Sequence, residues 1–114
     1  RTFCYITDAA TGFLKVMLRG TPGEAYNIGN EDNEISMKNL AELFIKLEGN
    51  DASYQLIPYP ANYPGGKPQR RAPNIGKARA DLAFAPQVNL EQGLKRFIEW
   101  CRGESNYMEG APHN

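Results

Sequence analysis

The chain has 114 residues, 41% of them hydrophobic, which is enough for one domain with an apolar core. Its 13 basic and 13 acidic residues cancel, and a net charge of zero argues against a nucleic-acid binder that depends on bulk electrostatic attraction. No apolar run approaches the roughly 20 residues that a membrane-spanning helix needs, and no signal peptide is visible, so we expect a cytoplasmic protein that does not contact membranes.

The cysteine and histidine content limits the kinds of site that the chain could form. Cys4 and Cys101 are far apart and show neither metal-ligand nor Cys-x-x-Cys spacing, which predicts two free thiols in a reducing compartment. The one histidine, His113, lies at the end of the chain in a segment without periodicity. The composition therefore argues against a zinc site and against a mechanism that depends on histidine.

Short strands and helices alternate in the first half of the chain. Residues 2–6 are β-branched or aromatic and read as a strand. The apolar positions between residues 10 and 18 follow helical spacing, with Thr7 or Asp8 as a candidate N-cap and Gly20 at the end. A second short strand is predicted over residues 25–28.

A second helix and a third strand follow. Ser36 is a good N-cap, and Gly49 is a suitable stop for the helix that it begins. The apolar face of this helix consists of Met37, Leu40, Ala41, Phe44 and Leu47. Residues 53–57 read as another short strand.

A long loop and two helices complete the chain. Residues 58–73 are rich in proline and glycine, which excludes a helix or a central strand. Asn74 is a candidate cap for a helix that reaches Leu82, and Asn89 begins the last helix, in which apolar residues form a stripe. After Arg102 the sequence lacks periodicity and is expected to fray.

These elements predict an α/β fold, or α+β for the isolated chain, in which three or four short strands alternate with about four helices. The strands are too few for an independent doubly wound sheet, so the pieces look like part of a larger assembly. We expect one domain over residues 1–102 and a flexible tail over residues 103–114.

The most distinctive feature is a basic segment between Asp51 and Asp81, an interval without any Asp or Glu. Its cations are Lys67, Arg70, Arg71, Lys77 and Arg79. A guanidinium presents paired donors that match the oxygens of a diphosphate, so this segment predicts an anion site, which Arg1 could also reach. Adjacent residues of an extended segment point to opposite sides, so only one of the two neighbouring arginines is expected to face a given ligand. A solvated basic loop is the alternative.

Aromatic residues and motif spacings near the loop are less specific. Tyr54, Tyr59 and Tyr63 either pack or stack on a base or sugar. A platform for single-stranded nucleic acid would also use aromatics among cations, but it needs a broader positive field. No GxGxxG motif is present. Tyr63 and Lys67 have the spacing of a Tyr-x-x-x-Lys pair, but the proline and two glycines between them prevent a shared helical face.

Four stretches in order resemble the C-terminal portion of the extended short-chain dehydrogenase/reductase family: RTFCYITDAATGFLKVML, GEAYNIGNEDNEISMKNLAEL, PQRRAPNIGKARADLAFAP and VNLEQGLKRFIEW. The sequence is most similar to the NAD-dependent epimerases and dehydratases of nucleotide sugars, in particular UDP-glucuronate decarboxylases and related 4,6-dehydratases. The resemblance implies a Rossmann-type N-terminal domain with an NAD site and a Tyr-x-x-x-Lys pair, both absent here. The chain therefore resembles the substrate-binding part alone.

The resemblance also implies roles for individual residues. Arg1 matches an arginine that contacts the diphosphate of the nucleotide sugar. Arg71 matches one that reaches the substrate and that, in the decarboxylases, has a role near the sugar carboxylate or in proton donation, so it is the candidate catalytic residue. Tyr63 is the nearest match for a tyrosine that contacts the uridine or the sugar. Arg70 supports this clamp or is solvated.

The resulting hypothesis is binding of a UDP- or dTDP-sugar as part of an NAD-dependent epimerase, dehydratase or decarboxylase that oxidises the sugar transiently at C4. NAD would be bound by the N-terminal half, so this chain alone is expected to be inactive. Exposed apolar helix faces would favour a homodimer or a higher oligomer. The alternative is a non-catalytic anion- or protein-binding module that folds and oligomerises alone.

Overall fold

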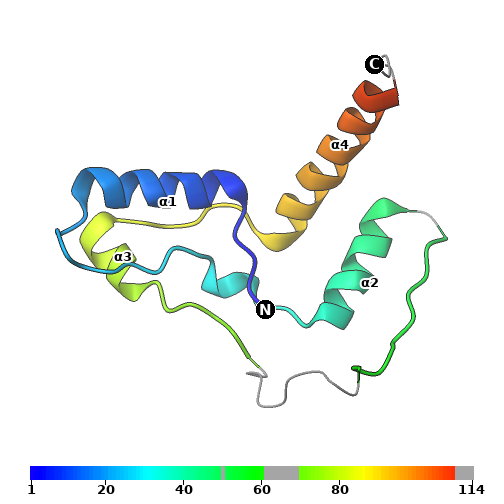
Figure 1. The fold of residues 1–114 in the computed structure, drawn as a ribbon, viewed down its shortest axis with the longest axis horizontal. Coiled ribbons are helices and arrows are strands. Elements are labelled where there is room, and N and C mark those ends of the chain that lie inside the picture. The colour runs from blue at the N-terminus through cyan, green and yellow to red at the C-terminus, as the bar shows by residue number, and fades with distance from the viewer. Residues whose placement is uncertain (50, 61–69, 110–114) are drawn as a thin grey trace.

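The computed structural model describes residues 1–49, 51–60 and 70–109 as an open arrangement of helices (Figure 1). The helices are α1 (Ile6–Arg19), α2 (Met37–Glu48), α3 (Gly76–Leu82) and α4 (Leu90–Glu109), with one 3-10 helix, η1 (Glu31–Asn33). The radius of gyration of the Cα atoms is 18.1 Å, whereas a compact domain of this length has about 13 Å. The chain therefore leaves much of its apolar surface uncovered.

The predicted helices are confirmed, with some differences at their ends. Ser36 caps α2 as expected, since its Oγ accepts a hydrogen bond from Asn39 N at 3.1 Å, and Gly49 ends this helix with a φ of 70°. Asn89 Oδ1 accepts from Gln92 N at 2.9 Å at the start of α4. The last helix continues through Glu109, past the residue at which we expected the periodic part to end.

The cap expected for the first helix is wrong. The helix begins at Ile6, its N-cap residue is Tyr5, and no side chain there makes a capping hydrogen bond. Asp8 instead lies inside the first turn, where it is buried and bonded to a distant segment. A polar side chain near a helix start can serve tertiary contacts as well as a cap, and the local sequence does not distinguish these uses.

The α/β prediction is not confirmed by the part of the chain that the structure describes. The segments 2–6, 25–28 and 53–57 form no strands there, and the one pairing of this kind is an isolated antiparallel bridge between Thr2 and Glu34. β-Branched and aromatic residues favour an extended backbone, but a strand also needs a neighbour to complete its hydrogen bonds.

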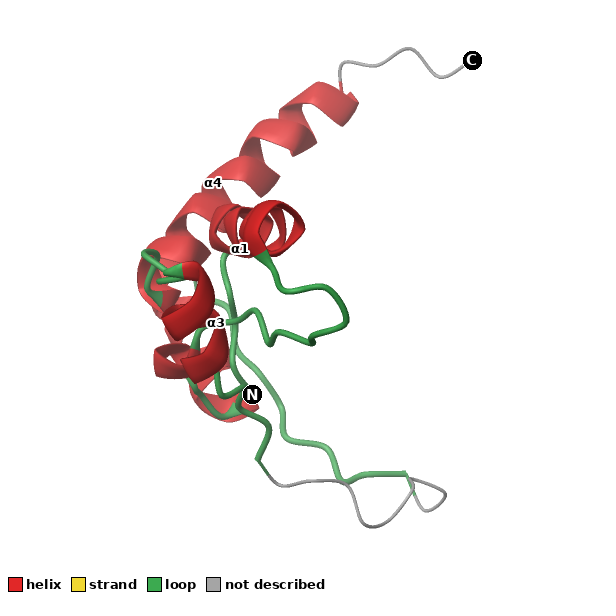
Figure 2. Ribbon diagram, turned by 90° about the vertical axis from the view of Figure 1, so that its left-hand side faces the viewer, coloured by secondary structure: helices red, strands yellow, loops and turns green. Residues whose placement is uncertain are grey.

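The core lies between α1 and α3, which are in contact, and α3 lies below α1 in both ribbon views (Figures 1 and 2). Its fully buried members are Ile75, Ala78, Leu82 and Phe84. Helix α1 approaches this cluster closely at Gly12, where an added Cβ would lie 2.5 Å from Ile28 Cγ2 and 3.0 Å from the Phe84 ring. The burial expected for the third helix is therefore confirmed, and a small residue in α1 permits the contact.

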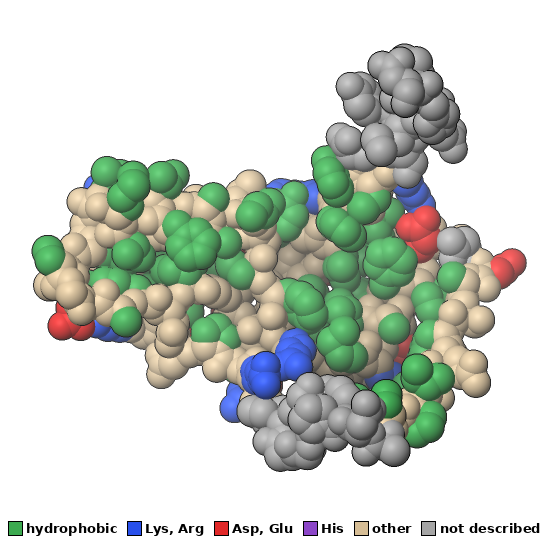
Figure 3. Space-filling model, in the orientation of Figure 1, with side chains coloured by type: hydrophobic (Ala, Val, Ile, Leu, Met, Phe, Trp, Pro, Cys, Tyr) green, Lys and Arg blue, Asp and Glu red, His purple; other side chains and the backbone are tan. Residues whose placement is uncertain are grey.

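The apolar stripe of α1 faces away from this core. Its members are exposed: Ile6 71%, Phe13 64%, Leu14 54%, Met17 72% and Leu18 73%. Hydrophobic side chains cover α1, and also α2 and α4, on the face seen in Figure 3. In α4, where we expected a buried stripe, Ile98 is buried but Phe97 is 50% exposed. Helical periodicity predicted which residues form the apolar faces, but it did not predict whether these faces are buried.

No helix of the described residues is long and apolar enough to cross a bilayer.

Candidate functional site

The basic segment is largely paired with acidic residues that lie earlier in the sequence. Three of its cations form ion pairs with glutamates of the stretch 24–34: Lys77 with Glu24, Arg79 with Glu31, and Arg70 with Glu34. The interval between Asp51 and Asp81 contains no acidic residue, but the fold places glutamates from another segment next to three of its cations. The absence of acidic residues nearby in the sequence therefore does not leave these three cations unpaired. Which cations of the segment can bind a ligand therefore depends on which of them the fold places beside a glutamate.

Two of the three arginines predicted to bind substrate remain available for a ligand in the part of the chain that the structure describes. Arg71 is exposed and, like the side chain of Arg1, has no carboxylate within ion-pair distance among residues 1–49, 51–60 and 70–109. Both are predicted substrate-binding residues, and a guanidinium without a protein carboxylate retains its donors for an anion. Tyr63 and Lys67 lie outside the described residues.

Backbone contacts bring the chain start next to the segment before α2. The backbone nitrogen of Arg1 donates to Ile35 O at 3.0 Å, and Ile35 N donates to Arg1 O at 2.8 Å. The neighbouring residues, Thr2 and Glu34, form the antiparallel bridge. Arg70 then reaches Glu34 through two hydrogen bonds of 2.7 Å each, from Nε to Oε1 and from Nη2 to Oε2. Glu34 therefore connects the two segments that carry the available arginines.

This bidentate contact perturbs both partners. The hydrogen bond from Arg70 lowers the pKa of the Glu34 carboxyl, and the same bond raises the pKa of the Arg70 guanidinium. Because the carboxyl pKa is lowered in the fold, the stabilising effect of the pair is fully present above the ordinary value of 4.5 and is lost as the pH falls through the lowered value.

A side-chain NMR titration of Glu34 checks this pair. We expect its midpoint below the ordinary carboxyl value in the parent chain, and a return to that value in Arg70→Gln, because the donor that stabilises the carboxylate is removed. The Glu24 midpoint serves as an internal control, since Lys77 lowers the pKa of that carboxyl and is unchanged in the variant. Identical Glu34 midpoints in the two proteins would show that the contact does not persist in solution.

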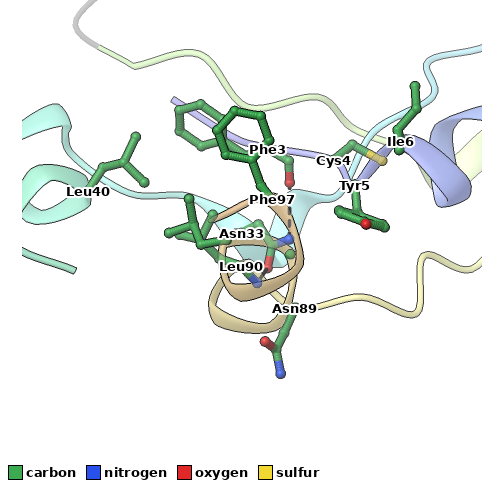
Figure 4. Close-up of a pocket in the computed structure, with 11 residues that line it drawn as sticks. Phe3, Cys4, Tyr5, Ile6, Asn33, Leu40, Asn89, Leu90 and Phe97 are labelled. Atoms are coloured by element: carbon green, nitrogen blue, oxygen red, sulfur yellow. Dashed lines mark hydrogen bonds between the residues drawn. The ribbon is translucent and has the colours of Figure 1, made fainter. Parts of the chain in front are cut away.

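An open apolar pocket of about 360 Å³ adjoins the chain start (Figure 4). Residues 3–6 form one wall, and α4 contributes Leu90 and Phe97. The lining is almost entirely apolar, so the pocket cannot stabilise a diphosphate, but it suits a planar or apolar group. Sequence reasoning missed this pocket because consecutive residues of the chain start line it together with residues of α2 and α4, and no local sequence pattern indicates such a combination.

Buried polar side chains hold the pocket walls together. Asn33 Nδ2 donates to Phe3 O at 3.0 Å and to Val88 O at 3.2 Å, while its Oδ1 accepts from Leu90 N at 3.0 Å. Figure 4 shows its contacts to Phe3 and Leu90. Asp8 Oδ2 accepts from Gln87 N at 3.0 Å and from Val88 N at 2.9 Å.

These bonds fix the N-terminal segment against the start of α4. Asn33 and Asp8 belong to no periodic pattern in the sequence, and their partners are distant in the chain. This network was therefore not predicted.

The described residues contain no cluster of His, Cys, Asp and Glu that could hold a metal ion. Cys4 and Cys101 form no disulfide with each other, as predicted. Burial raises the pKa of the Cys4 thiol, with a smaller contribution from the Asp8 carboxylate. Cys4 is therefore less ionised than an ordinary thiol, which fits packing better than nucleophilic chemistry.

No protein-family model matches the chain. Among curated proteins, it is 33% identical over 108 residues to the UDP-N-acetyl-alpha-D-glucosaminuronate decarboxylase of Bacillus cytotoxicus, which covers 93% of this chain and 33% of that protein. It is 35% identical over 104 residues to the human dTDP-D-glucose 4,6-dehydratase, covering 90% of this chain and 29% of that protein.

Solved structures give the same result. The Bordetella bronchiseptica enzyme WbmF in complex with NAD+ and UDP superposes with a TM-score of 0.76 at 31% identity, covering 96% of this chain and 31% of that one. The complex of WbmF with NADH superposes equally well, at 30% identity. The resemblance deduced from the sequence is therefore confirmed: the chain is a relative of nucleotide-sugar decarboxylases and 4,6-dehydratases, and it spans about one third of their length.

Proposed function

We propose that the chain binds a nucleotide sugar, as the substrate-binding C-terminal part of an NAD-dependent epimerase, dehydratase or decarboxylase. The observation that carries this proposal is the selective pairing of the basic segment. Arg70, Lys77 and Arg79 are occupied by glutamates, whereas Arg71 and Arg1 are exposed without a carboxylate partner among the described residues. Two such guanidinium groups suit the two phosphates of a nucleotide diphosphate.

The neighbouring pocket supports this ligand class. A nucleotide joins a charged diphosphate to a planar base, and here Arg1 lies at the end of a segment whose next residues line an apolar pocket. Phe3 and Phe97 both line it, and aromatic rings stack well on bases. The structure of WbmF with UDP and the decarboxylase named for a UDP-sugar make uridine nucleotides the first candidates.

The chain would supply positioning and anion neutralisation, and a separate domain would supply the redox step. NAD provides hydride transfer in enzymes of this kind, but the sequence contains no glycine-rich dinucleotide motif and no helical Tyr-x-x-x-Lys pair. We infer that NAD is bound by an N-terminal domain, whose docking would cover the exposed stripe of α1. In this chain Arg71 is the residue that we assign to the reacting sugar, and Arg1 is assigned to the diphosphate.

UDP binding measured by isothermal titration calorimetry tests the proposal. We expect Arg71→Ala and Arg1→Ala each to weaken binding by about tenfold or more, because charge-assisted hydrogen bonds contribute about 1.5–3 kcal/mol. Arg19→Ala is the matched control, since Arg19 is an exposed arginine at the opposite end of α1 and should leave the affinity unchanged. Absence of UDP binding by the parent chain, or equal binding by all four proteins, would contradict the proposal.

The second candidate is a non-catalytic protein-binding module, which the exposed apolar faces of α1 and α4 favour. Gel filtration beside the calorimetry separates the two. A stable oligomer without affinity for UDP favours the module, whereas affinity for UDP that depends on Arg71 favours the nucleotide-sugar proposal.

A further inference from the structure

We propose that the ion pair between Glu34 and Arg70 is a positioning device that holds the segment of Arg71 beside the chain start, where Arg71 and Arg1 bind one anion. The inference rests on the proposed function and extends it by assigning roles to two residues that would not touch the ligand. Arg70, predicted from the sequence to bind substrate, becomes a positioning residue through its contact with Glu34.

The first step concerns the chain start. In an antiparallel bridge, the two paired residues project their side chains to the same face, so Thr2 and Glu34 share a face. Consecutive residues of an extended segment alternate between faces. Arg1 therefore belongs to the face opposite to Glu34, together with Phe3, which lines the pocket.

The second step concerns the basic segment. Arg70 directs its guanidinium to Glu34, with both donor–acceptor distances at 2.7 Å, and so lies on the Glu34 face. Arg71 is the next residue of the same irregular, non-helical segment, and it is exposed. The pair thus joins segments 36 residues apart and holds the backbone that carries Arg71 beside the segment that pairs with the chain start.

The third step is the form of the contact. A bidentate guanidinium–carboxylate pair fixes orientation as well as distance, because both nitrogens and both oxygens must align. Neutralising Glu34 without any loss of orientation would favour anion binding, because a nearby negative charge is removed. If neutralising Glu34 instead weakens anion binding, the cause is that Arg71 is no longer held in position.

The experiment compares UDP affinity, by titration calorimetry, in Glu34→Gln and in Glu31→Gln. The two glutamates are closely matched, with side chains 31% and 32% exposed and an arginine partner each, but Glu31 pairs with Arg79 on α3. We expect Glu34→Gln to weaken UDP binding about two- to fivefold, the range measured for exposed ion pairs. Glu31→Gln should leave the affinity unchanged or raise it slightly. Circular dichroism confirms that each variant is folded.

Two further measurements separate positioning from a general structural effect. In the Arg71→Ala background, Glu34→Gln should cause no additional loss, because the residue that it positions is absent. The charge exchange Glu34→Arg with Arg70→Glu should recover at least part of the affinity that Glu34→Gln loses.

The outcomes distinguish this inference from the proposed function. If the parent chain binds UDP and Arg71→Ala loses it, but Glu34→Gln binds as well as the parent or better, the positioning role is refuted while nucleotide binding stands. The positioning role is also refuted if Glu34→Gln weakens binding equally with and without Arg71. If the parent chain does not bind UDP, both proposals fail together.

Discussion

Asn33→Ala is expected to lower the free energy of unfolding by about 2–4 kcal/mol, because it removes three hydrogen bonds that contribute about 0.5–1.5 kcal/mol each. Asn33 is only 7% exposed. Its loss would leave Phe3 O and Leu90 N without this partner in a site that water reaches poorly, and unsatisfied buried groups carry a larger cost than the bond itself. Urea unfolding followed by circular dichroism measures the change.

Two variants make this measurement specific. Asn39→Ala is the same chemical change at an exposed position, where only the backbone nitrogen takes part in the cap of α2, so it should change stability by less than about 0.5 kcal/mol. Asn33→Asp retains the acceptor for Leu90 N but places a buried carboxylate oxygen against Phe3 O and Val88 O, so at neutral pH we expect it to be at least as destabilising as Asn33→Ala. An Asn33→Ala protein as stable as Asn39→Ala would show that this network does not hold the pocket together.

The importance of Asn33 illustrates where sequence reasoning stops. Helices were predictable because a period of 3.6 repeats over many residues, and because Ser36 and Asn89 are caps whose partners lie three positions away. Asn33 acts through partners 30 and 57 residues away, at Phe3 and Leu90. A single asparagine in a polar loop gives no local signal of such contacts.

Ion pairs of the basic segment could not be predicted either, because they also join residues that are distant in the sequence. This segment's lack of acidic residues was visible in the sequence and indicated the stretch that contains Arg71. Which cations are available depends on glutamates 36 to 53 residues earlier in the chain, brought into contact only by the fold. Linear charge patterning therefore located the segment but could not separate Arg71 from Arg70.

The missing strands have a physical reason of a different kind. Residues 2–6 and 25–28 have the composition of strands, and the relatives are about three times longer than this chain. A strand that pairs with another part of a sheet cannot form its ladder when that part is absent from the structure. The same reasoning applies to the α1 stripe, whose apolar residues follow the helical period but meet no partner in the described residues.

We expect the chain to self-associate through the exposed stripe of α1, and Phe13→Glu combined with Met17→Glu to abolish this association while changing the free energy of unfolding by less than about 1 kcal/mol. The two side chains are 64% and 72% exposed, so the folded chain loses few contacts when they change. An exposed apolar stripe on one helix is a contact surface for another molecule, and two carboxylates in its centre would have to be desolvated on association. Sedimentation velocity over a concentration series measures the effect.

Asn39→Glu combined with Gln92→Glu adds the same two charges at exposed polar positions and provides the control. Because both positions lie in the first turn of a helix, these glutamates should be tolerated, and self-association should persist. If both double variants dissociate, net charge rather than the α1 stripe is responsible. If neither does, contact between copies runs through another surface, for which the exposed Phe97 and Trp100 of α4 are the first candidates. Dissociation of the α1 variant alone would identify the stripe as the surface that a covering domain would have to occupy.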